Sequence, residues 1–182
     1  MTQLSDATIR ALIEDGTIGI SPYNPDRVQP ASLDVTVGDQ WAVPRLDLDN
    51  GDTVIDAVNR DTRFFNITSP EHTMRPGDFL LATTTETIRL PPHIAAKFEG
   101  KSSLGRIGLM THVTAGFIDP GFHGQITLEL HNVWPEPIRL HAGMPIGQLV
   151  FTVLDRPTER PYGSPGLGSR YQYQSGTTGA RP

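Results

Sequence analysis

The stretch Gln-Ile-Thr-Leu-Glu-Leu-His (125–131) alternates strictly between polar and apolar side chains. Successive side chains of a β-strand point to opposite faces of a sheet, so this period of two predicts a strand. The apolar face, made of one isoleucine and two leucines, is expected to pack into a core. The other face places Glu129 in mid-strand, with Thr127 and His131 on either side of it.

A second alternating stretch and several short apolar runs follow the same logic. Residues 32–37 alternate and are expected to end at a Gly38-Asp39 turn. Further strands, each close to a Gly or Pro turn, are expected at 79–83, 87–90, 94–98, 138–140 and 146–154. Short strands joined by such turns predict an all-β fold, an antiparallel sandwich or barrel of the jelly-roll type.

One short helix is expected before the strands. Ser5 is a suitable N-cap for this helix, and Gly16 is a suitable residue to end it. Between them, Ile9, Leu12 and Ile13 lie on one helical face. The 18 glycines and 16 prolines of the chain favour many turns and argue against a helical bundle.

The composition excludes several classes of protein. A chain of 182 residues and 19.9 kDa fits a single domain, which we expect to span 1–182. The absence of Cys excludes disulfides, Cys-ligated zinc, iron–sulfur clusters and thiol nucleophiles. A formal net charge of −5 argues against a nucleic-acid partner. No apolar run approaches the roughly 20 residues that span a bilayer and no signal-peptide core opens the chain, so we expect a cytoplasmic protein without a membrane partner.

The segment Gly-Lys-Ser-Ser-Leu-Gly-Arg (100–106) concentrates glycines, hydroxyls and two cations. Backbone N–H groups and Ser hydroxyls can donate hydrogen bonds to phosphate oxygens, while Lys and Arg neutralise the charge. The order of the residues is not that of a Walker A loop. From these residues alone, an anion cradle and an ordinary solvated basic turn both remain open.

Two carboxylates are candidates for chemistry. Asp119, just before a Pro-Gly turn, either caps that turn or binds a sugar hydroxyl or a water. Glu129 either faces solvent or enters a polar pocket, where it can shuttle protons. The six histidines show no metal-ligand spacing, and Ser102 and Ser103 do not lie in the nucleophile elbow of a hydrolase.

Two segments lack the strand pattern. Residues 45–62 are rich in Asp and Asn and are expected to form a surface excursion from the sheet. Residues 157–182 are dominated by Gly, Ser, Pro, Tyr and Gln, which is typical of a disordered terminus. An arm that orders over a ligand, using Tyr162, Arg170, Tyr171 and Gln174, is the alternative.

Together these motifs resemble the dCTP deaminase family. The resemblance rests on Gly-Lys-Ser-Ser-Leu-Gly-Arg-Ile-Gly-Leu-Met-Thr-His-Val-Thr-Ala-Gly-Phe-Ile-Asp-Pro-Gly-Phe (100–122) and Gln-Ile-Thr-Leu-Glu-Leu-His-Asn (125–132). It extends to Gln-Pro-Ala-Ser-Leu-Asp (29–34), to Gly-Met-Pro-Ile-Gly-Gln-Leu (143–149) and to Tyr-Gly-Ser (162–164) and Tyr-Gln (171–172) in the tail. The matches are colinear and run from the first helix to the tail, with 45–62 the least distinctive part.

The resemblance implies a homotrimer of distorted jelly-roll β-barrels, of the kind found in trimeric dUTPases, with active sites between subunits. Residues 157–182 then form a flexible C-terminal lid arm. The substrate is dCTP, and its cytosine is deaminated without zinc, which agrees with the absence of Cys because zinc deaminases use His and Cys ligands. Mg²⁺ is expected to arrive with the triphosphate, held mainly by phosphate oxygens and waters, with no dedicated protein metal site.

Catalytic roles are carried over residue by residue. Glu129 takes a proton from the water that attacks C4 of the cytosine, and passes protons to N3 and to the leaving ammonia. Ser102 and the backbone carbonyl of Ala115 orient that water, and Arg106 holds Glu129. Asp119 meets the 3′-hydroxyl of the deoxyribose. The nucleotide-binding residues implied by the resemblance are Lys101, Ser102, Ser103, Leu104, Gly105, Arg106, Asp119, Thr127, Leu128, Glu129, Gln148, Tyr162, Arg170 and Gln174.

Gly116 and Phe117 separate two subtypes of the family. Deaminases that release dUTP typically carry His-Arg at these positions, whereas Gly-Phe resembles the bifunctional enzymes that form dUMP directly. The resemblance therefore favours a bifunctional hydrolase over a dUTP-releasing deaminase, and a dUTPase alone would leave Glu129 without a purpose. A nucleotide-binding regulatory barrel without turnover is the alternative from another class. Family members are often inhibited by dTTP, and His112-Val113 lie where such a switch could act.

Overall fold

Strands carry most of the regular structure in the computed structural model, which describes residues 2–45, 54–60 and 62–181. The first half contains β1 (Thr2–Gln3), α1 (Asp6–Glu14), β2 (Gly19–Ser21), η1 (Pro25–Arg27), β3 (Val28–Gln29), β4 (Ser32–Pro44), β5 (Phe64–Thr68), β6 (Glu71–Met74) and β7 (Phe79–Arg89). The second half contains β8 (Ile94–Gly100), α2 (Ser102–Gly105), β9 (Leu109–Met110), β10 (Phe117–Ile118), β11 (His123–Asn132), β12 (Ile138–His141) and β13 (Pro145–Val153). The predicted all-β fold class is confirmed.

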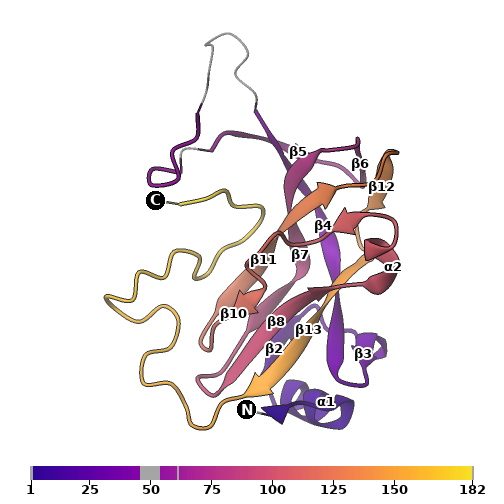
Figure 1. The fold of residues 1–182 in the computed structure, drawn as a ribbon. Coiled ribbons are helices and arrows are strands. Elements are labelled where there is room, and N and C mark those ends of the chain that lie inside the picture. Colours follow the sequence, from indigo (N-terminus) through magenta and orange to yellow (C-terminus); the bar gives the residue numbers. More distant parts are fainter. Residues whose placement is uncertain (1, 46–53, 61, 182) are drawn as a thin grey trace.

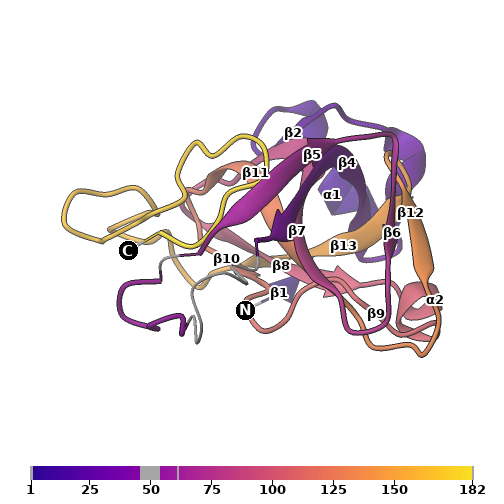
Figure 2. The same cartoon turned by 90° about the horizontal axis from the view of Figure 1, so that it is seen from above.

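The main sheet runs in the order β10-β8-β13-β4-β7-β11-β9 and curls into a barrel-like shape (Figures 1 and 2). All of its pairs are antiparallel. A separate two-stranded sheet joins β12 to β6. Because β4 lies at the centre of this order, it connects the half of the sheet that holds β8 and β13 to the half that holds β7 and β11.

The turn predicted at Gly38-Asp39 is wrong, because β4 continues through these residues to Pro44. Up to Thr36 the strand pairs with β13, from Val37 onward it pairs with β7, and from Gln40 onward it also pairs with β5. The register of the β4–β7 pair shifts between Val37 and Trp41, which marks a bulge. The glycine therefore lies in a bulge just after the change of partner strand, and it does not mark the end of the strand.

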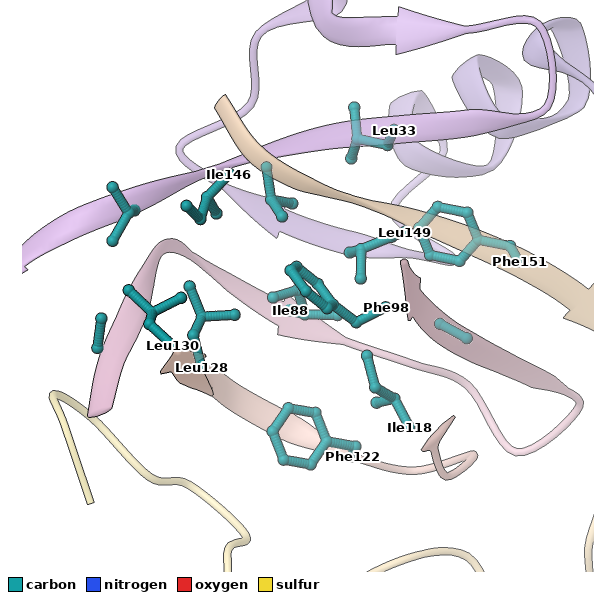
Figure 3. Packing of buried hydrophobic residues seen from close by; sticks show 14 of the residues in the cluster. Leu33, Ile88, Phe98, Ile118, Phe122, Leu128, Leu130, Ile146, Leu149 and Phe151 are labelled. Atoms are coloured by element: carbon teal, nitrogen blue, oxygen red, sulfur yellow. The ribbon is translucent and has the colours of Figure 1, made fainter. Parts of the chain in front are cut away.

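The core lies between the two halves of the curled sheet. Figure 3 shows Leu33, Leu149 and Phe151 from β4 and β13 facing Ile88 and Leu128 from β7 and β11. All five side chains are buried, as the alternating pattern of their strands predicts. Apolar burial of this kind is the main stabilising contribution to a domain of this size.

Helix α1 is close to its prediction. Ser5 is its N-cap, although the Ser5 side chain makes no capping hydrogen bond, and Ile9 is fully buried. Gly16 follows the helix with a φ of 78°, the left-handed conformation that glycine adopts most readily. No helix in the described part of the chain is both long and apolar enough to cross a membrane.

The strands differ from the sequence expectation in number and in boundaries, and several two- or three-residue strands (β1, β2, β3, β9 and β10) were not expected. The two strands expected at 79–83 and 87–90 are one strand, β7, because no turn interrupts it. The strands β5 and β6 were not expected, since β5 begins with two adjacent phenylalanines and β6 is mostly polar, so neither shows a clear alternation. The surface excursion predicted at 45–62 falls partly on 46–53 and 61, which lie outside the described residues.

Candidate active site

A cavity of about 380 Å³ is lined by residues of β7, β10 and β11 and by residues of the C-terminal tail. Its walls are mostly apolar, with two carboxylates and several hydroxyl and amide groups among them. The lining residues are Thr62, Phe64, Phe79, Leu81, Ala115, Phe117, Ile118, Asp119, Phe122, Ile126, Thr127, Glu129, Tyr162, Tyr171, Gln174, Thr178, Gly179 and Ala180. Pockets that bind small molecules commonly combine apolar walls with a few polar groups in this way.

Glu129 reaches this cavity from the middle of β11, where it lies opposite Leu81 of β7. One carboxylate oxygen, Oε2, accepts a hydrogen bond of 3.0 Å from the backbone N–H of Val113. That bond fixes the orientation of the carboxylate and uses only one of its two oxygens. A carboxylate held in this way at the edge of a pocket is suited to exchange protons with a bound water.

The alternation of β11 decides which side chains meet the cavity. Thr127 and Glu129 line it, whereas Leu128 between them is 0% exposed and lies in the core. Leu128 can therefore contact a ligand only through its backbone. The hydroxyl of Thr127 is buried and has no hydrogen-bond partner among the described residues. Buried polar groups are nearly always paired, so this hydroxyl is available to a bound molecule.

The loop between β9 and β11 supplies Ala115, Phe117 and Asp119 to the same cavity. Gly116 lies beneath its surface: its carbonyl accepts a 2.7 Å hydrogen bond from the Phe98 N–H. A Cβ atom added at Gly116 would lie 2.7 Å from the carbonyl oxygen of Phe98. No side chain fits there without a shift of the backbone. Phe117, by contrast, is 61% exposed and forms an apolar edge of the cavity.

The C-terminal tail packs across the cavity through hydrogen bonds to the start of β11 (Figure 1). The Gln172 side chain donates to the carbonyl of Gly121 at 2.9 Å and accepts from the N–H of His123 at 3.0 Å. The backbone carbonyl of Gln174 accepts from the N–H of Gln125 at 3.0 Å. These contacts place Tyr162, Tyr171 and Gln174 on the outer wall of the cavity. Arg170 lies in the same tail but does not line it.

The remaining predicted site residues lie elsewhere on the chain. Lys101, Ser102, Ser103, Leu104, Gly105 and Arg106 form or flank α2, and Gln148 lies on β13. Figures 1 and 2 show α2 and the C-terminal tail on opposite sides of the molecule. The expected irregular loop at 102–105 is one helical turn. Within one chain, the predicted site residues therefore form two separate groups.

Sequence reasoning missed the residues that anchor the tail. Gln172 and Gln125 lie within motifs of the family resemblance, but the sequence assigns neither of them a role. The side-chain oxygen of Gln125 accepts from the N–H of Gly176 at 2.7 Å. Gly124 was the one sequence signal for close packing of the tail on β11. A Cβ atom at this position would lie 2.9 Å from the Gln174 carbonyl oxygen. The apolar walls, such as Phe79, carry no sequence signal that separates them from the core.

No cluster of three or more His, Asp or Glu side chains in the described part of the chain is placed to hold a metal ion.

Comparison with known proteins places this arrangement in context. A family model described as dCTP deaminase-like matches residues 3–154. A relative from Thermobifida fusca (strain YX), named "dCTP deaminase, dUMP-forming", is 47% identical over 98% of this chain and 91% of its own length. A relative of the same name from Beutenbergia cavernae is 50% identical over 98% of this chain and 93% of its own length.

Among solved structures, the chain is similar to the 2′-deoxycytidine 5′-triphosphate deaminase from Agrobacterium tumefaciens, with a TM-score of 0.63 and 28% sequence identity. The similarity covers 83% of this chain and 47% of that one, so this chain spans about half the length of the solved protein. The family match over most of the sequence and the two relatives at 47% and 50% identity agree with each other. The chain therefore belongs to the dCTP deaminase-like family.

Proposed function

We propose that the protein converts dCTP and two waters to dUMP, ammonia and pyrophosphate, and so supplies dUMP for thymidylate synthesis. The reaction follows from membership of the dCTP deaminase-like family together with relatives named as dUMP-forming. The observation in this chain that carries the proposal is the orientation of Glu129, held by the Val113 N–H at the edge of an apolar cavity.

Deamination is the first hydrolysis. Glu129 removes a proton from a water, the resulting hydroxide adds to C4 of the cytosine, and Glu129 delivers the proton to N3. A second proton transfer to the exocyclic amine lets ammonia leave and restores the carbonyl of uracil. General acid–base groups of this kind contribute about 10²–10⁴-fold in rate. We assign the orientation of the water to the Ala115 carbonyl and the Ser102 hydroxyl, and the support of Glu129 to Arg106.

Hydrolysis at the α-phosphorus is the second step, and it releases pyrophosphate. A water must approach in line with the leaving group, which needs free space and an orienting acceptor. We assign that acceptor role to Asp119, which lines the same cavity as Glu129. Gly116 adds no side chain, and the space above it is limited by Phe98 and bounded by Phe117. This small, uncharged surface is compatible with a second water at the site.

Mg²⁺ is proposed to bind together with the nucleotide. A triphosphate supplies most of the oxygen ligands that this ion prefers, and waters complete its shell. Bound Mg²⁺ neutralises charge on the phosphates and on the pyrophosphate leaving group. The chain itself contributes cations and hydrogen-bond donors, from Lys101, Arg106 and Gln148, that fix the phosphates in position. No zinc is assigned to the site.

A homotrimer is proposed because the two groups of predicted site residues lie apart on one chain. Next to α2, Ile107, Met110, Val133 and Trp134 are all exposed and lie around β9. Exposed apolar groups that gather in one place commonly mark a protein interface. If this surface meets a neighbouring copy, the α2 group of one subunit can complete the cavity of the next. The tail then closes as a lid over the triphosphate.

A cytoplasmic location and inhibition by dTTP are proposed from family membership alone. dTTP is the end product of the route that dUMP enters, so its binding would reduce the supply of dUMP. His112 lies beside the cavity loop, with its ring at the edge of the Phe98 ring, at a centroid distance of 5.8 Å. Its Nδ1 atom is buried without a partner among the described residues.

Product analysis tests the function directly. The purified protein is incubated with dCTP and Mg²⁺, and nucleotides, ammonia and pyrophosphate are followed over time. We expect dUMP and pyrophosphate to appear at the rate of ammonia release, with little free dUTP. Accumulation of dUTP without pyrophosphate would identify a simple deaminase, and the absence of any ammonia would leave a nucleotide-binding barrel without turnover.

A Gly116→His, Phe117→Arg double variant is the matched comparison in that assay. The crowding above Gly116 forces the loop to move when a side chain is added, and the new charge disturbs the second water. We expect this variant to keep ammonia release and to accumulate dUTP. Unchanged dUMP formation would contradict the role given to these two residues.

A further inference from the structure

We propose that Ser32 and Asp34 are positioning residues that hold Gln148 and Lys101 in the orientation needed to bind the phosphate chain. The proposal rests on the function proposed above, in which Gln148 and Lys101 reach the triphosphate. It assigns a role to the segment 29–34, a motif of the family that neither the cavity nor the catalytic steps account for.

The polar face of β4 is buried, which is unusual for a strand that alternates. Leu33 and Val35 point into the core, yet Ser32, Asp34 and Thr36 on the opposite face are also at most 8% exposed. Burying a charged or hydroxyl-bearing side chain costs free energy unless a partner compensates it. The partners of these three residues therefore show what the polar face is for.

Asp34 is compensated by one contact. Its Oδ2 atom lies 2.6 Å from Nζ of Lys101, which stands between β8 and α2. The other oxygen, Oδ1, is buried and has no hydrogen-bond partner among the described residues. Asp34 therefore depends on Lys101 for its charge compensation, and it holds the ammonium group at one place. An ammonium has three donors, so the Asp34 contact leaves others for an anion.

Ser32 acts on Gln148 in a comparable way. Gln148 lies directly opposite Asp34 in the β4–β13 register, and the Ser32 hydroxyl donates to its Oε1 atom at 2.7 Å. Because this bond occupies the acceptor oxygen of the amide, the two N–H donors must point elsewhere. The Gln148 amide is thus held as a donor, which is the polarity that a phosphate requires.

Thr36, next on the same face, provides the contrast. Its hydroxyl and its N–H both donate to Glu86, and Arg27 lies 2.8 Å from the same carboxylate. Both oxygens of Glu86 are therefore paired, and the Thr36 cluster is a closed structural network. The Asp34 and Ser32 pairs differ because each leaves donors of Lys101 and Gln148 for another molecule.

The Asp34→Asn variant tests this assignment with inorganic tripolyphosphate as the probe. Calorimetry measures binding of the probe to the intact protein, so the result does not depend on turnover. We expect the dissociation constant of tripolyphosphate and the KM for dCTP to rise about tenfold, with a smaller change in kcat, as for loss of one charge-assisted contact. Binding of 2′-deoxycytidine, which has no phosphates, should stay unchanged.

Asp39→Asn is the matched control, because Asp39 is an exposed residue of the same strand and the substitution is identical. It should bind tripolyphosphate as the unmodified protein does. In a Lys101→Ala background, Asp34→Asn should add little further loss, because its effect passes through Lys101. Full additivity of the two substitutions, or equal losses for tripolyphosphate and 2′-deoxycytidine, would overturn the proposal.

Ser32→Ala provides a second and independent test that does not place an uncompensated ammonium in the structure. It frees the Gln148 amide to rotate, and we expect a threefold to tenfold weaker binding of tripolyphosphate, as for loss of one neutral hydrogen bond. If Asp34→Asn fails to fold, this variant decides, and unchanged tripolyphosphate binding by it refutes the positioning role. Absence of ammonia release by the unmodified protein would refute the proposed function and not this inference.

Discussion

The cavity region and the α2 region differ in the sign of the charges that they present. The cavity between β11 and the tail carries two carboxylates, Glu129 and Asp119, among apolar walls. The α2 region carries Lys101 and Arg106, and Lys101 contacts Asp34, which lies opposite Gln148 of β13. The first arrangement suits proton transfer to and from a nucleobase and contact with a sugar. The second arrangement suits the binding of a polyphosphate.

The separation of the two regions follows from the topology of the barrel. The strand β4 leads from the pairing with β13 to the pairing with β7, and a bulge follows Val37. Within one chain the two sets of groups lie on opposite sides of the molecule (Figures 1 and 2). If the proposed functions of the two regions are right, proton transfer and phosphate binding depend on separate parts of one chain, and the proposed trimer would bring them together.

The largest effect is expected in the cavity region, from Glu129→Gln. The amide keeps an oxygen that can accept the hydrogen bond from Val113, so the shape of the site is preserved, but the proton shuttle is removed. Ammonia release from dCTP should fall by at least about 10²–10⁴-fold. Calorimetric binding of dCTP should remain close to that of the unmodified protein.

Glu71→Gln is the control for this variant, since it makes the same substitution at a half-exposed position of the small β6–β12 sheet. It should release ammonia at the normal rate. Near-normal ammonia release by the Glu129→Gln variant would show that Glu129 does not transfer the protons of the reaction.

The second prediction tests whether the two regions meet between subunits. Arg106→Ala and Glu129→Gln proteins should each have very low activity, because one lacks the α2 region's cation and the other the proton shuttle. Random assembly after co-expression combines an intact α2 region with an intact cavity in about a quarter of all sites, so activity should recover to about that fraction. Activity no higher than that of the parent variants would place both regions in one subunit's site.

The third prediction concerns the tail as a part of the cavity region. Deleting residues from Gly166 onward removes Gln172 and Gln174, which hold the tail on the start of β11. The barrel core does not involve these residues, so the truncated protein should remain folded. Turnover should fall by about 10- to 100-fold, because the cavity stays open to water and the phosphates are less well placed.

Circular dichroism and gel filtration establish that the truncated protein is folded and assembled. A point variant, Gln172→Ala, should give a loss in the same direction but smaller, since the backbone bonds of Tyr173 and Gln174 to β11 remain. Normal turnover of the truncated protein would show that the tail is not a lid.

The alternation of polar and apolar residues predicted much of the fold from the sequence alone. The alternation at 125–131 correctly predicted a strand with Leu128 in the core and Glu129 on the other face. It failed at Gly38, because a bulge and a turn share the same glycine signal and only the partner strands distinguish them. It also could not join 79–83 to 87–90, since the polar residues between them are compatible with a strand or a loop.

The candidate site was predicted less completely, for a physical reason. Charged and polar residues such as Glu129 and Lys101 stand out in a sequence, and the family resemblance gave each a role. Their distribution over two faces of the barrel depends on long-range strand pairing, which no local pattern encodes. The link from Asp34 to Lys101 joins residues 67 positions apart, on β4 and just after β8, and it depends on the pairing of both strands with β13.

The smallest effect is expected far from both regions, at His72 on β6. Burial against Trp41, whose ring is stacked on it at 5.7 Å, lowers the pKa of His72 below its usual value, and the charge of Asp78 opposes this only in part. The unfolded chain therefore binds a proton at His72 at a higher pH than the folded chain does, so stability declines as the pH falls below about 6.5. A His72→Phe variant keeps a ring on Trp41 and removes the titration. Thermal melts at pH 7.5 and 5.5 should show a smaller pH-dependent change in Tm for the variant, by about 2 °C or less. An identical pH dependence in the two proteins would show that burial of His72 is not linked to folding.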